Sequence, residues 1–139
     1  MKIYTGGAMS FHFFNGEIEL AKKWRNSVKY FFDVRGGKVD IYNPAKCFLE
    51  LNGEYNVSNM AQLNYQHLKN SDVFLLDLNK LEESIGTIWE ISLCWQLHIP
   101  IVAFGKCEKW QYSPHYKEMV KHEHKDLDDA LNYIWLNFF

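Results

Sequence analysis

The sequence lacks any run of about 20 consecutive apolar residues, the length that a membrane-spanning helix needs. We therefore expect no membrane association. The segment Met1–Ser10 contains Gly6 and Gly7 and has no apolar core of the kind found in secretory signals. Cysteine is scarce, with 3 widely spaced residues, which argues against a disulfide framework. These features predict a reducing, cytoplasmic compartment.

Charge of one sign is not in excess either. Lys and Arg total 15, Asp and Glu total 17, and the formal net charge is -2. This balance argues against a nucleic-acid polymer as the partner. The 139 residues contain no repeat, no low-complexity run and no proline-rich linker, so we expect a single domain, residues 1–139.

Aromatic residues, by contrast, are abundant at 17% of the chain. A core of this size cannot bury all of these rings, so we expect some of them to line a pocket or a subunit contact. The aromatic content therefore predicts a homo-oligomer.

The hydrophobic pattern alternates between strands and helices. Strands are expected at Lys2–Thr5, Val39–Tyr42, Val73–Leu78, Ile99–Phe104 and Val120–His124. Helices are expected at Glu17–Phe32, Asn59–Lys69, Ser84–Leu97 and Leu127–Phe138, the last one capped by Asp126. Such alternation predicts an α/β fold: a doubly wound (flavodoxin/Rossmann-like) parallel sheet of four to five strands, flanked by helices.

Ligands of such sheets bind beyond the carboxyl ends of the strands. This rule directs attention to the segments Gly6–Phe14, Asn43–Asn52 and Asn79–Glu90. At Gly6-Gly7, the absence of side chains lets backbone N–H groups approach a phosphate or a sugar. An ordinary tight turn would explain the same glycines.

The segment Ser84–Glu90 opens a predicted helix, whose free N–H groups and Ser and Thr hydroxyls favour an anion. Glu90 follows about two turns into that helix, among apolar residues. A carboxylate there costs free energy unless it is paired or used chemically. A solvated glutamate on the outer face of the helix remains the alternative.

Several of these residues, in this order, resemble the nucleoside 2-deoxyribosyltransferase family, which includes related deoxynucleoside 5'-monophosphate N-glycosidases. The resemblance is carried by Tyr4, Asp72 and the segment Ser84-x-Gly86-Thr87-x-x-Glu90, and also by Trp24-Arg25, Asn43-Pro44 and the run Ile99–Gly105. It extends over nearly the whole chain.

The resemblance implies an enzyme that cleaves the N-glycosidic bond of 2'-deoxynucleosides or their 5'-monophosphates. Glu90 would attack the sugar and form a covalent glycosyl ester, and another base or water would then accept the sugar. Tyr4 would position Glu90 by a hydrogen bond. Gly6, Gly7, Ser84, Gly86 and Thr87 would bind the sugar or phosphate end, and Met119 lies near a position that reaches a neighbouring subunit's site. No metal and no organic cofactor is expected.

Two positions depart from the family pattern. Transferases that use free nucleosides carry Asp where this chain has Ser84, whereas the monophosphate hydrolases carry Ser, which favours a nucleotide substrate. Asn64 stands where the family has an Asp that protonates or orients the leaving base, and an amide cannot donate that proton. Base departure is then slower, uses another acid such as Asp77, or does not occur. A catalytically weak or inactive nucleotide-binding module is the alternative function.

Overall fold

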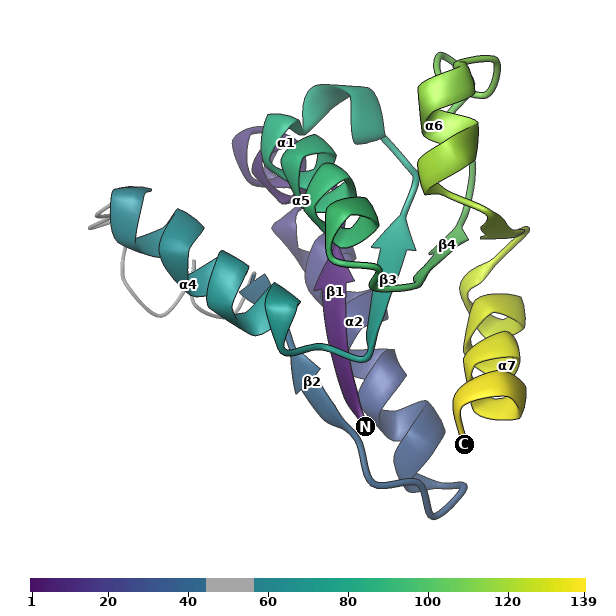
Figure 1. Ribbon diagram of the computed structural model, residues 1–139. Coiled ribbons are helices and arrows are strands. Elements are labelled where there is room, and N and C mark those ends of the chain that lie inside the picture. The colour runs from purple at the N-terminus through teal and green to yellow at the C-terminus, as the bar shows by residue number, and fades with distance from the viewer. Residues whose placement is uncertain (45–56) are drawn as a thin grey trace.

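The computed structural model describes residues 1–44 and 57–139, and a parallel sheet runs through its centre (Figure 1). Its five strands lie in the order β2-β1-β3-β4-β5, and each neighbouring pair is parallel. This order is that of the flavodoxin-like doubly wound sheet. The strands are β1 (Lys2–Gly6), β2 (Asp40–Tyr42), β3 (Val73–Asp77), β4 (Ile101–Phe104) and β5 (His122–His124). The predicted α/β fold is confirmed.

Helices cover both faces of the sheet. They are α1 (Met9–Phe14), α2 (Ile18–Asp33), α4 (Val57–Lys69), α5 (Ile85–Gln96), α6 (Pro114–Met119) and α7 (Leu127–Phe138), with a 3-10 turn η1 at Leu81–Glu83. Apolar residues of α2 and α7 form one core, and those of α4, α5 and α6 form the other. Within the described part of the chain, no helix has the length and hydropathy needed to cross a bilayer.

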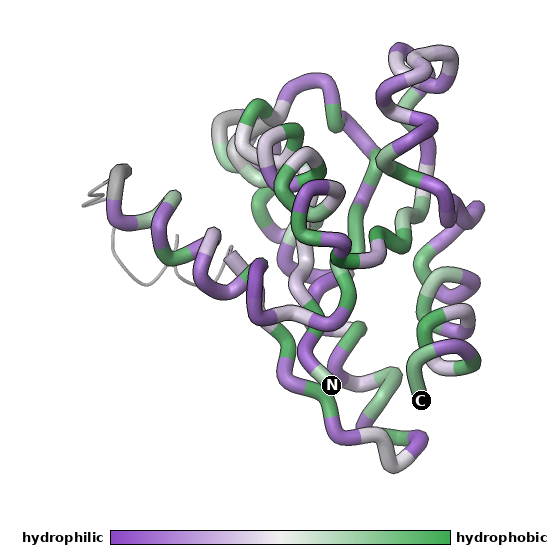
Figure 2. The backbone as a smooth tube through the Cα atoms, viewed as in Figure 1, coloured by the Kyte–Doolittle hydropathy of each residue, from purple (hydrophilic) through white to green (hydrophobic). Residues whose placement is uncertain are grey.

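Alternation along the strands divides the side chains between these two cores. In β1, Ile3 packs toward α2 and α7, and Tyr4 packs toward α5. All five residues of β3 are buried, as expected for a central strand that is covered on both faces. Figure 2 shows that α5 is largely apolar, whereas α4 is mostly hydrophilic. Tyr4 therefore points into the apolar layer beneath α5.

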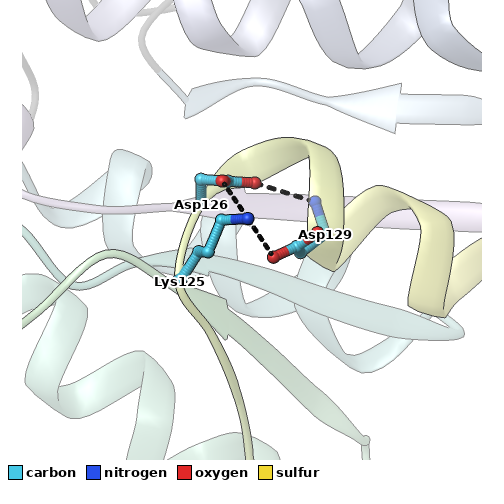
Figure 3. Close-up of polar contacts among 3 residues, drawn as sticks. All are labelled: Lys125, Asp126 and Asp129. Atoms are coloured by element: carbon cyan, nitrogen blue, oxygen red, sulfur yellow. Dashed lines mark hydrogen bonds and ion pairs between the residues drawn. The ribbon is translucent and has the colours of Figure 1, made fainter.

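The start of α7 agrees with the sequence-based expectation. Asp126 is the N-cap, and its Oδ1 accepts a hydrogen bond of 3.0 Å from the backbone N–H of Asp129. Lys125 lies 3.5 Å from Asp126 and 3.4 Å from Asp129, so it bridges the two carboxylates (Figure 3). The predicted cap is confirmed.

Two short helices are present in addition to the elements expected from the sequence. The helices α1 and α6 were not predicted, because both are only six residues long and too short to show periodicity. A local signal for α6 does exist: Ser113 caps it by accepting from the N–H of Tyr116, and Pro114 occupies the first turn. Of the expected ligand segment Asn43–Asn52, most lies outside the described residues.

Candidate active site

A pocket of about 320 Å³ opens at the carboxyl end of β1, next to α4 and α5. This is the edge at which doubly wound sheets bind ligands. Side chains and backbone from both faces of the sheet contribute to it. The lining residues are Thr5, Gly6, Gly7, Met9, Arg25, Pro44, Met60, Asn64, Glu83, Ser84, Ile85, Gly86, Thr87 and Glu90. The structure thus brings together six predicted site residues, Gly6, Gly7, Asn64, Ser84, Gly86 and Thr87, with Glu90.

Glu90 lines this pocket, although the residue is only 6% exposed. Tyr4, which is fully buried, donates a hydrogen bond of 2.5 Å from its hydroxyl to Glu90 Oε1. The two residues are 86 positions apart and meet because β1 lies beneath α5. Glu90 is therefore not on the solvated outer face of its helix.

The second oxygen of Glu90 has no hydrogen-bond partner among the described residues. A Cβ atom placed on Gly6 would lie only 3.2 Å from this Oε2, so the missing side chain of Gly6 makes room for the carboxylate. Tyr4 holds Oε1, and Oε2 remains available for chemistry. A carboxylate with one oxygen held and the other free is suited to nucleophilic attack.

Burial changes the acid–base properties of this pair. It raises the pKa of Glu90 to about 7, against the opposing effects of the Tyr4 hydrogen bond and the positive charge of Arg25. Burial and the Glu90 charge raise the pKa of Tyr4 far above its usual value, so its hydroxyl stays protonated and donates. Near neutral pH, Glu90 is poised between its acid and its carboxylate form.

A chain of hydroxyl groups fixes the start of α5 to the turn after β1. Thr87 Oγ1 donates to the backbone carbonyl of Gly7 at 3.1 Å. Because the proton of Thr87 is used there, Ser84 Oγ must donate to Thr87 Oγ1, 2.8 Å away, while it accepts from the Thr87 N–H. The hydroxyl protons of Ser84 and Thr87 are thus both used in hydrogen bonds within the protein. Ser84 therefore offers a ligand an acceptor oxygen and no donor.

Asn64 on α4 also lines the pocket. Its Oδ1 accepts a hydrogen bond of 2.9 Å from the hydroxyl of Tyr42, whose ring stacks on His67 with the centroids 3.8 Å apart. The amide nitrogen makes no hydrogen bond with the described residues. With its carbonyl occupied, Asn64 presents N–H donors to a ligand.

Two predicted residues lie elsewhere. Asp77 does not line the pocket; its Oδ1 accepts hydrogen bonds from the backbone N–H and the side-chain amide of Asn79, at 3.0 and 2.7 Å. Burial raises the pKa of Asp77, against these hydrogen bonds. Met119 on α6 packs against the core below α5 and lines a separate surface cavity. Within one chain, Met119 does not reach the Glu90 pocket.

Arg25 on α2 is a pocket residue for which the sequence analysis assigned no role. It is 3% exposed, its Nη1 donates to the carbonyl of Ala21 at 2.7 Å, and its guanidinium lies 4.4 Å from the ring centre of Trp24. Burial lowers the pKa of Arg25 to about 10, so it remains charged at neutral pH. The helical spacing of the sequence did indicate that Arg25 is buried, since Arg25 lies on the same face of α2 as the buried Ala21 and Val28.

The raised pKa of Glu90 predicts a pH dependence of stability. Unfolded Glu90 ionises near its ordinary pKa, whereas folded Glu90 holds its proton until about pH 7. Its contribution to stability is complete below the unfolded pKa and is lost as the pH rises through the folded one. Urea unfolding at pH 5 and pH 8 should show roughly 2 kcal/mol more loss of stability in the wild type than in Glu90→Gln. Equal losses would contradict this prediction.

No protein-family model matches the sequence, and no curated protein matches it. Among solved structures, a 2-deoxyribosyltransferase of Bacillus psychrosaccharolyticus aligns with a TM-score of 0.70 and 17% identity, over 96% of this chain and 92% of that one. The CMP N-glycosidase of Clostridium botulinum gives a TM-score of 0.60, 19% identity and 98% coverage of both chains. A conserved protein of Enterococcus faecalis gives 0.58 and 20%, covering 99% of this chain and 87% of that one.

At this level of sequence identity, the similarity to these structures is a similarity of fold. The chain has the fold shared by a 2-deoxyribosyltransferase and a CMP N-glycosidase, in agreement with the resemblance to the 2-deoxyribosyltransferase family and its related N-glycosidases. The coverage shows that this shared fold extends over nearly the full length of the chain and of both neighbours.

Proposed function

We propose that this protein cleaves the N-glycosidic bond of a 2'-deoxynucleoside or its 5'-monophosphate and passes the sugar to another base or to water. The observation that carries the proposal is the buried Glu90 carboxylate, held on one oxygen by Tyr4 and open on the other toward the pocket. The shared fold and the ordered sequence resemblance support the same assignment.

The proposed reaction has two displacements. Glu90 Oε2 attacks the anomeric carbon, the bond from that carbon to the base breaks, and the base leaves with the bonding electrons. The resulting glycosyl ester is then attacked by a second base or by water, which returns the carboxylate. Two inversions retain the configuration of the sugar. The hydroxyl of Tyr4 stays on Oε1 throughout and fixes the plane of the carboxyl group.

The departing base is stabilised by hydrogen bonds in this proposal. Asn64 points N–H donors at its acceptor atoms, because Tyr42 already occupies the amide oxygen. An amide cannot supply a proton, so the base takes its proton from water. Asp77 is engaged with Asn79 and lies outside the pocket lining, and we therefore assign the leaving base to Asn64 rather than to Asp77.

The remaining pocket residues hold the sugar end. The turn Gly6-Gly7 and the exposed Gly86 let a ligand approach the backbone closely, and Ser84 Oγ accepts from a sugar hydroxyl. We further propose a homo-oligomer in which Met119 approaches a neighbouring copy's pocket. The exposed rings of Trp89 and Tyr112, 42% and 79% accessible, support such an assembly.

The test is an incubation of the protein with deoxynucleosides and their 5'-monophosphates, with and without a free acceptor base, followed by chromatography. A new nucleoside formed with the added base identifies a transferase, and free base alone identifies a hydrolase. Either result supports the proposal. Stabilisation by a nucleotide against thermal unfolding, with no base released over hours, would instead identify a nucleotide-binding module and would contradict it.

A further inference from the structure

We propose that Arg25 is a positioning residue of this site, whose buried guanidinium favours the carboxylate form of Glu90 and aligns it beside the Gly6-Gly7 turn. Its catalytic consequence rests on the proposed function. The electrostatic coupling between Arg25 and Glu90 does not, and it can be measured without any turnover.

The geometry places the two charged groups on either side of adjacent glycines. A Cβ atom on Gly7 would lie 3.5 Å from Arg25 Nη2, and one on Gly6 would lie 3.2 Å from Glu90 Oε2. Arg25 reaches this place from α2, on the face of the sheet opposite to α5. The turn without side chains thus lets a cation from one face and a carboxylate from the other approach the same backbone.

Arg25 is only partly satisfied by the protein. Nη1 donates to the carbonyl of Ala21, but Nε is buried without a hydrogen-bond partner. Its guanidinium forms no ion pair within 4 Å with any described carboxylate. The Trp24 ring lies against the guanidinium but carries no negative charge. A buried cation without a close anionic partner is costly, so packing alone does not account for an arginine here. An electrostatic role toward the nearby carboxylates accounts for it.

The other titratable groups around the site cannot replace this charge. Tyr4 of β1 and Cys94 of α5 face Glu90, and burial raises the pKa of both, so both are neutral. Asp77 of β3 also faces Arg25, but a carboxyl group cannot supply a positive charge. The groups around Glu90 and its neighbours also include Tyr42 of β2, His12 of α1, which faces Asp77, and Glu83 in the pocket lining. Among the described groups, Arg25 is the cation that acts on Glu90.

The experiment follows the Glu90 carboxyl carbon by NMR in protein labelled with [δ-13C]glutamate. Its signal is assigned by its disappearance in Glu90→Gln. In Arg25→Met the titration midpoint of Glu90 should rise by about one pH unit or more, because the carboxylate loses its stabilising cation. Arg25→Lys keeps the charge and should return the midpoint most of the way to the wild-type value.

The outcomes separate the two proposals. An unmoved midpoint in folded Arg25→Met overturns the role of Arg25, whatever the activity. A raised midpoint in a protein that never releases base supports the coupling and overturns the proposed function. In an active enzyme, the acid limb of the kcat/KM profile should move with the midpoint, which a purely structural arginine would not cause.

A second variant covers the case in which Arg25→Met does not fold. Arg25→Gln removes the charge and keeps an N–H donor at this position. The Glu90 midpoint should rise in this variant, as in Arg25→Met. A midpoint that stays at the wild-type value overturns the proposal.

Discussion

Replacing Glu90 by glutamine is expected to lower the rate of base release at least ~10³-fold. The amide oxygen is too weak a nucleophile to form a glycosyl ester, so the first displacement is lost. Tyr4 can still donate to Oε1 of the amide, and the neutral side chain suits the buried position better than a carboxylate does. The variant should therefore fold normally and bind substrate, and the loss should fall on kcat.

The measurement combines kinetics with mass spectrometry. Acid-quenched wild-type protein should carry one sugar on the peptide that contains Glu90, and the variant should carry none. Glu19→Gln is the matched control, because Glu19 is an exposed carboxylate that pairs with Lys22 on the surface of α2. In Glu90→Ala, added formate should restore part of the base release by occupying the vacated space. A variant that keeps its rate would refute the assignment of the nucleophile.

Replacing Gly6 by alanine is expected to disturb both stability and activity. The new Cβ would overlap the buried ring of Phe74 and crowd Oε2 of Glu90. Overpacking of this kind costs about 1–3 kcal/mol. Displacing the carboxylate by about 1 Å should lower kcat by about 10²-fold. The two effects have one cause, since the same methyl group touches both side chains.

Urea unfolding and initial rates measure these two effects. Gly86→Ala is the control for stability, because a Cβ at Gly86 meets nothing within 4 Å and alanine favours a helix. It should unfold at the same urea concentration as the wild type or at a higher one. If Gly6→Ala were as stable and as active as the wild type, the close approach of Glu90 to the β1 turn would not exist in solution.

Much of the fold was predictable because it depends on local patterns. The apolar run in β3 and the helical spacing in α2 each indicate an element by themselves, and together they indicate a parallel sheet. The short helix α1 was not predicted, because six residues after a glycine turn carry no periodic signal. Its formation depends on the neighbours against which it packs.

The candidate site was predictable only in part. The position of Gly6 and Glu90 near strand ends follows from the order of the elements, and the sequence resemblance singled out both. The sequence left open whether Glu90 faces solvent, because positions about two residues apart lie on nearly opposite faces of a helix. The sequence also suggested Asp77 as the acid that protonates the leaving base, but in the structure the Asp77 carboxyl group accepts a hydrogen bond from Asn79. No role in the site was predicted for Arg25 from the sequence.

The amino-acid sequence by itself determined the α/β alternation, the cap at Asp126 and the residue types available at the strand ends, since these follow from neighbours along the chain. Only the tertiary structure decided that Glu90 meets Tyr4 and that Arg25 enters the same pocket from the other face of the sheet. Such contacts join residues from separate elements, and their geometry depends on how strands pair and helices pack. Burial, which sets the charge of Glu90, arises from that same packing.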